Sequence, residues 1–255
     1  MLVVRDAQID VFSRLPRVRF EDQLITHFTK FYPVEAAELG VDQLKVFTQL
    51  AIERAKKYGI TSQRDVSYFA SIMFSLGSYF DEDPQFIWTG DLLNNKTSRA
   101  ESIDLLFEKT IEYLEDSTGP DSIYLVKAMI RIRGYDMESL CELEGRNIEE
   151  VARECLINIY PEKCQLMGDE LLNRLIKHGV DKAEERQLYR IKSRIAYITL
   201  MFMLGAGFDK DPLYPWANEV IDDQSIVEED NKTNKLFEVA VQHINHSLKR
   251  EEAVN

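Results

Sequence analysis

The stretch LGSYFDEDPQFIW at residues 76–88 returns as LGAGFDKDPLYPW at residues 204–216, with each position repeated 128 residues later. Seven of the thirteen positions are identical, among them the pairs Asp81 and Asp209, Asp83 and Asp211, Pro84 and Pro212, and Trp88 and Trp216. Self-similarity at a fixed offset indicates copies of one structural unit. The sequence therefore predicts an internal duplication.

Further matches extend the repeat over most of the chain: Tyr32-Pro33 with Tyr160-Pro161 and Leu2–Arg5 with Ile130–Arg133 at the same offset, and Leu106–Glu108 with Leu236–Glu238 at an offset of 130. Lys57–Ile60 resembles Lys177–Val180 at an offset of 120, which predicts that the second copy is eight residues shorter there. Together these matches predict two tandem, structurally similar helical-bundle domains at residues 1–120 and 121–255.

Apolar side chains recur at helical spacing in both copies, and no stretch alternates like a strand. The predicted helices are Arg19–Tyr32, Asp42–Tyr58, a helix capped by Ser62, and Ser98–Asp116 in the first copy, then Asn147–Tyr160, Asp169–His178, Lys182–Phe208 and Lys232–Lys249 in the second. Glu115–Asp121 has the composition of a linker. With 11 glycines and 7 prolines in 255 residues, the chain suits an all-α fold with short loops.

The chain carries a formal net charge of −13, which excludes several partners. Nucleic acids and anionic membranes require a clustered basic face, so we expect neither as a partner. No signal peptide or membrane-spanning stretch is evident, and three cysteines without paired spacing fit a reducing compartment, so we expect a cytoplasmic protein. An acidic surface favours a basic protein partner, although acidity also serves solubility alone.

The repeated aspartates allow three interpretations. Asp81 and Asp83 stand two residues apart, as do Asp209 and Asp211, and such pairs can begin an oxygen cage for a metal ion. However, a proline follows directly and the rest of a calcium loop is missing. The structural interpretation is a turn fixed by aspartate and proline, with the tryptophan four residues later as a mostly buried packing anchor. The third interpretation is a surface that binds a partner.

Motifs for catalysis are missing. The sequence has no nucleophile elbow, phosphate-binding loop or dinucleotide fingerprint. His243 and His246 stand three residues apart with Glu238 one turn earlier, but no third metal ligand is evident, and a solvated helix face explains them better. We therefore predict a protein that is not an enzyme, with no catalytic residue, no bound metal and no cofactor.

The start with Ile or Val before Arg, the helix end at Tyr-Pro, the Tyr-Gly-Ile turn and the Phe-Asp-x-Asp-Pro-x-x-Pro-Trp motif together resemble a family of small helical bacterial proteins. That family is largely uncharacterised and is encoded beside type VI secretion spike, PAAR-tip and effector genes. The second copy matches the last motif through Trp216, whereas Ile87 replaces its second proline in the first copy. The resemblance implies a role in secretion and brings no catalytic residues.

Three functions compete. The first is a cytosolic adaptor or chaperone that helps load a type VI effector onto the spike. The second is an immunity protein that binds and neutralises a toxin acting in the cytosol. The third is a helical hydrolase with an unrecognised carboxylate cluster. For the first two, the acidic stretches Glu108–Asp121 and Asp222–Asp230 are the candidate surfaces for a protein partner, against the alternative that each is a solvated segment without a role.

Overall fold

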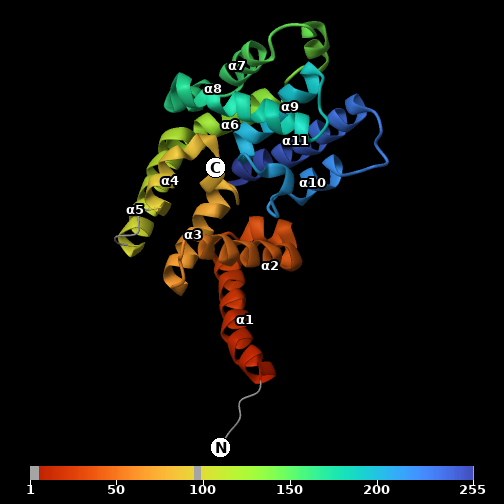
Figure 1. Ribbon diagram of the computed structural model, residues 1–255. Helices are drawn as coiled ribbons and strands as arrows, with labels where there is room; N and C mark the ends of the chain where they lie inside the picture. Colours follow the sequence, from red (N-terminus) through yellow and green to blue (C-terminus); the bar gives the residue numbers. More distant parts are fainter. Residues whose placement is uncertain (1–5, 95–98, 255) are drawn as a thin grey trace, which may run out of the picture.

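The computed structural model describes residues 6–94 and 99–254, with side chains for 19–94 and 101–249, and every regular element in these ranges is a helix (Figure 1). The all-α prediction is thus confirmed. The α-helices are α1 (Asp6–Phe31), α2 (Pro33–Lys57), α3 (Gln63–Leu76), α4 (Ile87–Asn94), α5 (Arg99–Thr118), α6 (Ile123–Arg133), α7 (Ile148–Ile159), α8 (Pro161–Glu185), α9 (Ile191–Leu204), α10 (Pro215–Ile221) and α11 (Glu229–Val254). Short 3₁₀ helices are η1 (Phe80–Glu82), η2 (Pro84–Phe86), η3 (Pro120–Ser122), η4 (Glu138–Leu143) and η5 (Phe208–Lys210).

Several elements of the first half, residues 6–118, reappear in the second half, residues 119–254, with the same bounds. α2 spans residues 33–57 and α8 spans 161–185, so both ends are shifted by 128. α3 and α9 show the same shift, from 63–76 to 191–204. Even the interruptions agree, because Gly40 and Gly168 break α2 and α8 with φ of +75° and +73°.

The predicted eight-residue shortening of the second half is wrong. Gly59 follows α2 with φ of +70°, and the residue with this conformation after α8 is Gln187, with φ of +61° at an offset of 128. Gly179, which the sequence match paired with Gly59, lies inside α8 and is closely approached by Met201 and Ile198. At this position the second half has Gln187 and no glycine, so the sequence comparison used the nearest glycine, Gly179, which lies in a helix.

Two other helix predictions need correction. The stretch predicted as one helix over Lys182–Phe208 is divided, because α8 continues to Glu185 and α9 begins only at Ile191. The predicted linker is largely helical, since α5 runs to Thr118 and the break begins at Gly119 with φ of +73°. By contrast, Ser62 caps α3 as expected, accepting the amide of Asp65 at 3.1 Å.

The halves differ most at their beginnings. In the first half α1 is one long helix that extends away from the body of the molecule in Figure 1. In the second half the corresponding chain is divided between η4 and α7, and α6 precedes it against α5 and α11. The predicted match at Leu2–Arg5 and the predicted cap Ser98 lie outside the described residues.

Each half has its own hydrophobic core. The first is built around Phe28, Phe47 and Phe69, which are fully buried, and the second around Tyr197 and Phe202. The loops after α3 and α9 bring the two halves together. None of the helices in the described ranges combines the length and apolarity needed to cross a membrane.

Candidate binding site at the junction of the two halves

Asp83 and Asp211 each reach across the junction to the backbone of the opposite half. A carboxylate oxygen of Asp83 accepts the backbone N–H of Ala206 at 2.7 Å. Asp211 accepts the backbone N–H of Ser78 at 2.7 Å and its hydroxyl at 2.6 Å. The two acceptors are 128 residues apart, and so are the two donor residues, so the junction is formed by reciprocal contacts.

Each aspartate also fixes its own turn. Asp83 accepts the backbone N–H of Gln85 at 2.8 Å, and Asp211 accepts that of Leu213 at 2.9 Å, with a proline between in both cases. Both carboxyl groups are buried, and burial raises their pKa although the hydrogen bonds act in the opposite direction. The second aspartate of each motif therefore serves both the turn and the junction.

Two glycines allow this close approach. A Cβ atom on Gly77 would lie 2.8 Å from the carbonyl oxygen of Leu204, and one on Gly205 would lie 3.0 Å from that of Leu76. Their φ values of +98° and +102° are also unfavourable for any residue with a side chain. The two backbones thus meet where no side chain fits.

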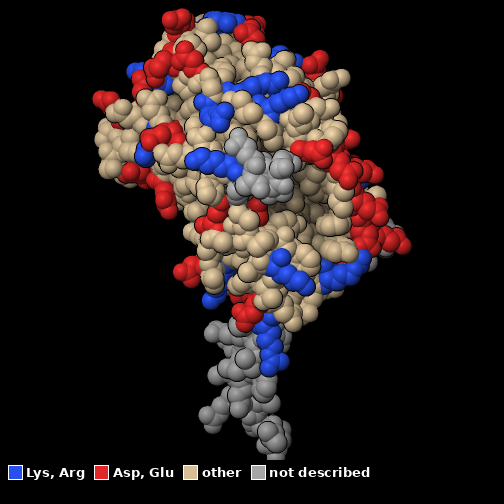
Figure 2. Space-filling model, turned by 180° about the vertical axis from the view of Figure 1, so that it is seen from behind, with Lys and Arg blue, Asp and Glu red and all other residues tan. Residues whose placement is uncertain are grey.

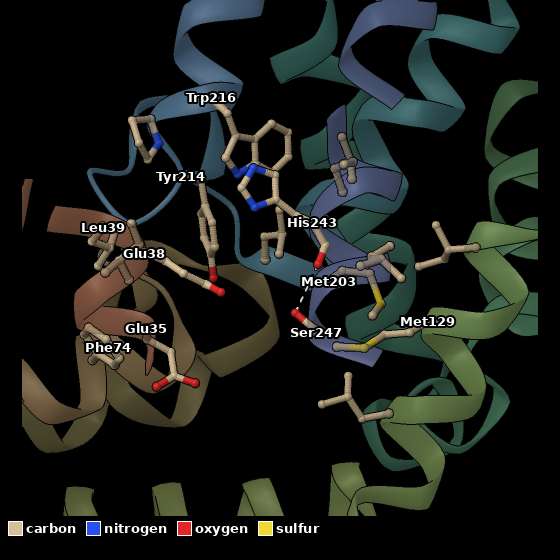
Figure 3. A pocket seen from close by; sticks show the side chains of 18 residues that line it. Glu35, Glu38, Leu39, Phe74, Met129, Met203, Tyr214, Trp216, His243 and Ser247 are labelled. Atoms are coloured by element: carbon tan, nitrogen blue, oxygen red, sulfur yellow. Dashed lines mark hydrogen bonds between the residues drawn. The ribbon is translucent and has the colours of Figure 1, made fainter. Parts of the chain in front are cut away.

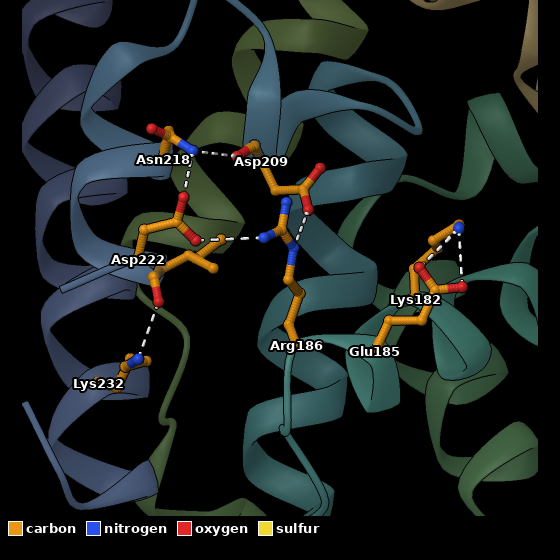
Figure 4. A network of polar contacts seen from close by, with 8 residues as sticks. Lys182, Glu185, Arg186, Asp209, Asn218, Asp222 and Lys232 are labelled. Carbon is orange, nitrogen blue, oxygen red and sulfur yellow. Dashed lines mark hydrogen bonds and ion pairs between the residues drawn. The ribbon is translucent and has the colours of Figure 1, made fainter. Parts of the chain in front are cut away.

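The first aspartate of each motif points elsewhere. Asp81 pairs with Arg54 and accepts the hydroxyl of Tyr58 at 2.6 Å. In the second half the position of Tyr58 is taken by Arg186, which donates to Asp209 at 2.6 Å and to Asp222 at 3.2 Å (Figure 4). The carboxylates of each motif therefore diverge, and within the described residues no group of three or more metal-ligating side chains is positioned to hold a metal ion.

A pocket of about 370 Å³, here called the Trp216 pocket, opens between the two halves (Figure 3). Most of its surface is apolar and comes from α2 and α3 of the first half and from α6, α9, α10 and α11 of the second. The lining residues used below are Glu35, Glu38, Phe74, Met129, Met203, Tyr214, Trp216 and His243. Its size is at the lower end of the range of about 300–1,000 Å³ typical of ligand pockets.

The two carboxyl groups of the Trp216 pocket are on one wall, whereas His243 and Ser247 come from α11. Glu35 and Glu38 stand on α2, across the pocket from Met129 and Met203 in Figure 3. Glu38 pairs with His246 of α11 at 2.9 Å, a pair that is ionic only when the imidazole is protonated. No lysine or arginine is among the described residues that line this pocket.

His243 covers the indole of Trp216. The two rings stack with centroids 5.1 Å apart and planes inclined by 21°. Burial lowers the pKa of His243, with His246 acting in the same direction and Glu38 opposing it. Since a lowered pKa keeps the imidazole neutral at pH 7, it adds no positive charge to the pocket.

A smaller pocket of about 120 Å³, here called the Lys163 pocket, is also lined by both halves and shares Leu125, Met203, Leu204 and Tyr214 with the Trp216 pocket. Lys163 takes the position of Glu35, 128 residues later, and Phe86 takes that of Tyr214. The ammonium group of Lys163 donates to the carbonyl oxygen of Phe202 at 2.5 Å and lies 4.5 Å from the centre of its ring. The same structural position thus carries a carboxylate in one pocket and an amine in the other.

The buried amine of Lys163 should make stability depend on alkaline pH. Burial lowers its pKa to about 8, while Asp83 opposes the shift. The unfolded chain holds this proton up to about pH 10.5, so the contribution of Lys163 to the free energy of unfolding should rise by about 2 kcal/mol from pH 7.5 to 9.5. Urea unfolding at both pH values should show the rise in the wild type and not in Lys163→Met. Equal pH dependence of the two proteins would contradict it.

Trp88 and Trp216 both have most of their surface covered and pack against the core of their own half, which agrees with the expectation of mostly buried anchors. Trp88 packs on the first core beside Phe86, with ring centroids 6.5 Å apart, and does not line the Trp216 pocket. Trp216 does line it, so equivalent residues have different surroundings. The glutamates of α2 and the histidine of α11 carried no sequence signal for this site, because they come from helices about 200 residues apart in the chain.

The two predicted acidic stretches differ in how they are paired. In Asp222–Asp230, Asp222 binds Arg186, Asp230 binds Arg190, and Glu229 accepts the backbone N–H of Arg190 at 2.7 Å. The α5 stretch exposes its carboxylates to solvent. On the face shown in Figure 2, acidic side chains are densest along one edge but also lie at the top and along the opposite edge, and lysines and arginines form several separate groups between them. The negative charge is thus unevenly distributed.

Comparisons with models of protein families, with curated proteins and with solved structures found no match for this chain. The Trp216 pocket offers apolar surface to bury a group of a ligand, together with a few polar groups that can orient it.

Proposed function

We propose that the protein is a non-catalytic protein-binding module, acting as a cytosolic adaptor or chaperone for a type VI secretion effector or spike component. The observation that carries this proposal is the Trp216 pocket, an open apolar site formed jointly by two halves that each have their own core. Exposed apolar surface of this kind is typical of sites that bind other proteins.

The side chains of the pocket suit a segment of a protein partner. Tryptophan and tyrosine, present as Trp216 and Tyr214, are enriched among residues that dominate binding energy. Met129 and Met203 supply flexible, polarisable walls that adapt to different shapes. Adaptable walls favour an adaptor that serves several cargoes over an inhibitor matched to one toxin.

We also propose that the two halves are copies of one unit. Support comes from the matched bounds of α2 and α8, the paired glycine breaks at residues 40 and 168, and the reciprocal contacts of Asp83 and Asp211. A duplicated unit would produce two related pockets at the junction. The smaller pocket then carries the buried amine of Lys163, whereas the larger one is open for a partner.

One observation favours the alternative of an immunity protein. Glu101, Glu108, Glu112 and Glu115 are exposed and follow one face of α5, at spacings of seven, four and three residues. Such a face complements a basic toxin, such as a nuclease, through its electrostatic field. Co-expression distinguishes the two: an immunity protein restores growth of cells that produce the toxin domain alone, whereas an adaptor does not.

Replacing Trp216 with alanine tests the proposed function. A partner is first isolated from the native cell, identified by mass spectrometry and purified. Trp216→Ala should then weaken its binding at least about 30-fold in calorimetric titration, because a central aromatic anchor contributes about 2 kcal/mol or more. The matched control is Trp88→Ala, which removes the tryptophan of the other half. Equal effects of both substitutions would show that the pocket is not the site.

A further inference from the structure

The Lys163 pocket is lined by a buried amine. The ammonium group of Lys163 reaches from α8 to α9, where it meets the ring and the carbonyl oxygen of Phe202. Asp83, the aspartate that crosses the junction, supplies a negative charge nearby. A cation over an aromatic face with an anion close by is a favourable arrangement. The junction therefore shows how this framework accommodates an amine.

The Trp216 pocket has the same framework without the amine. Phe74 takes the place of Phe202, and Glu35 takes the place of Lys163, both at an offset of 128. The aromatic ring therefore remains, and the position that carries the positive charge in one pocket is negative in the other. Glu38, one turn further along α2, adds a second carboxylate to the same wall.

We infer that the Trp216 pocket receives a lysine or arginine side chain of the protein partner, an inference that rests on the proposed function and names its ligand. The apolar stem of that side chain lies against Met129 and Met203, and its charged head faces Glu35 and Glu38. Long basic side chains combine an apolar stem with a charged end in this way. Tyr214 and Trp216 provide further aromatic faces for the cation.

Other ligands fit this pocket less well. A wholly apolar group would cover two carboxylates without replacing the water that hydrates them, which is costly. An acidic group would meet Glu35 and Glu38 with no lysine or arginine in the described lining to compensate. A basic head offsets the charge of the wall and is steered toward it by the net charge of −13.

The inference is tested with synthetic peptides of defined charge. The probe is an amphipathic helical peptide of leucine and lysine, and its partner peptide has glutamine at every lysine. Binding is followed by the fluorescence of Trp216 in a Trp88→Phe background, which leaves one tryptophan. We expect the lysine peptide to bind at least tenfold more tightly than the glutamine peptide.

Paired variants locate the charge that matters. Glu35→Gln with Glu38→Gln should weaken binding of the lysine peptide at least tenfold. Glu108→Gln with Glu112→Gln removes the same charge from the exposed face of α5 and should change it less than twofold. Glu35→Lys should also abolish binding, because it replaces a carboxylate of the wall with an amine that repels the lysine side chains of the peptide. Thermal unfolding of each variant checks that it is folded.

The outcomes separate this inference from the proposed function. Equal binding of both peptides, or equal losses in the two double variants, would overturn the basic occupant. If the native partner still depended on Trp216 in that case, the proposed function would stand alone. If neither the peptides nor the native partner depended on Trp216, both proposals would fail.

Discussion

Replacing Gly77 with alanine should lower the free energy of unfolding by about 3–5 kcal/mol, since strained backbone and steric overlap together reach the upper range of single substitutions. The new Cβ would lie 2.8 Å from the carbonyl oxygen of Leu204, a backbone atom that cannot move without disturbing α9. The φ of +98° at this position adds strain for any residue with a Cβ atom. Urea unfolding followed by circular dichroism measures the loss.

Gly40 provides the matched control for conformation alone. It has a φ of +75°, and a Cβ atom there would have no atom within 4 Å. Gly40→Ala should therefore lose only about 1–3 kcal/mol, the cost of a backbone conformation, φ +75° with ψ 161°, that residues with a Cβ atom rarely adopt. The difference between the two variants isolates the contact between the halves. If Gly77→Ala lost no more than Gly40→Ala, the two backbones would not meet as described.

The all-helical fold could be predicted because apolar spacing is a local property of the sequence. Phe28 and Phe47 lie on the predicted apolar faces and are fully buried. The aspartate–proline turn was also predictable, because the side chain of Asp83 bonds to an amide only two residues away. Both features, the helical spacing of apolar residues and the aspartate–proline turn, depend only on residues close together in the sequence.

The helix boundary near residue 187 was predicted wrongly, because no glycine marks the turn there. At Gln187 the chain turns with φ of +61° although no glycine marks the place, so the helix predicted over Lys182–Phe208 ran across the break between α8 and α9. The comparison then matched Gly59 with Gly179, which lies in a helix. A residue other than glycine can adopt this conformation when the surrounding structure supports it, and nothing in the local sequence reveals that support.

The site itself was only partly predictable. The repeated motif marked Asp83, Asp211 and Trp216 as important. The residues to which the two aspartates bind across the junction lie more than a hundred residues away in the chain. The docking of the two halves determines which backbone N–H groups donate hydrogen bonds to these aspartates. The pocket likewise depends on helices from both halves, so its acidic wall and aromatic face appear only in the folded chain.

The second large effect is expected at the aspartates that cross the junction. Asp83→Ala and Asp211→Ala should each lower the free energy of unfolding by about 3–5 kcal/mol. Removing a buried acceptor leaves several buried N–H and O–H donors without a hydrogen-bond partner. Asp211→Ala leaves the backbone N–H of Ser78 and its hydroxyl without their acceptor, together with the backbone N–H of Leu213. Asp83→Ala leaves the backbone N–H groups of Ala206 and Gln85 without their acceptor.

Asp223 is the matched control, because it forms the same turn without crossing the junction. It accepts the backbone N–H of Ser225 at 2.8 Å and the hydroxyl at 2.6 Å in the surface loop after α10. Water can replace its oxygen atoms there, so Asp223→Ala should lose much less stability than either junction variant. The double variant Asp83→Ala with Asp211→Ala should lose less than the sum of the single losses, since either substitution loosens the contact that the other aspartate needs. Strict additivity, or losses no larger than that of Asp223→Ala, would show that these carboxylates stabilise only their own turns and do not hold the halves together.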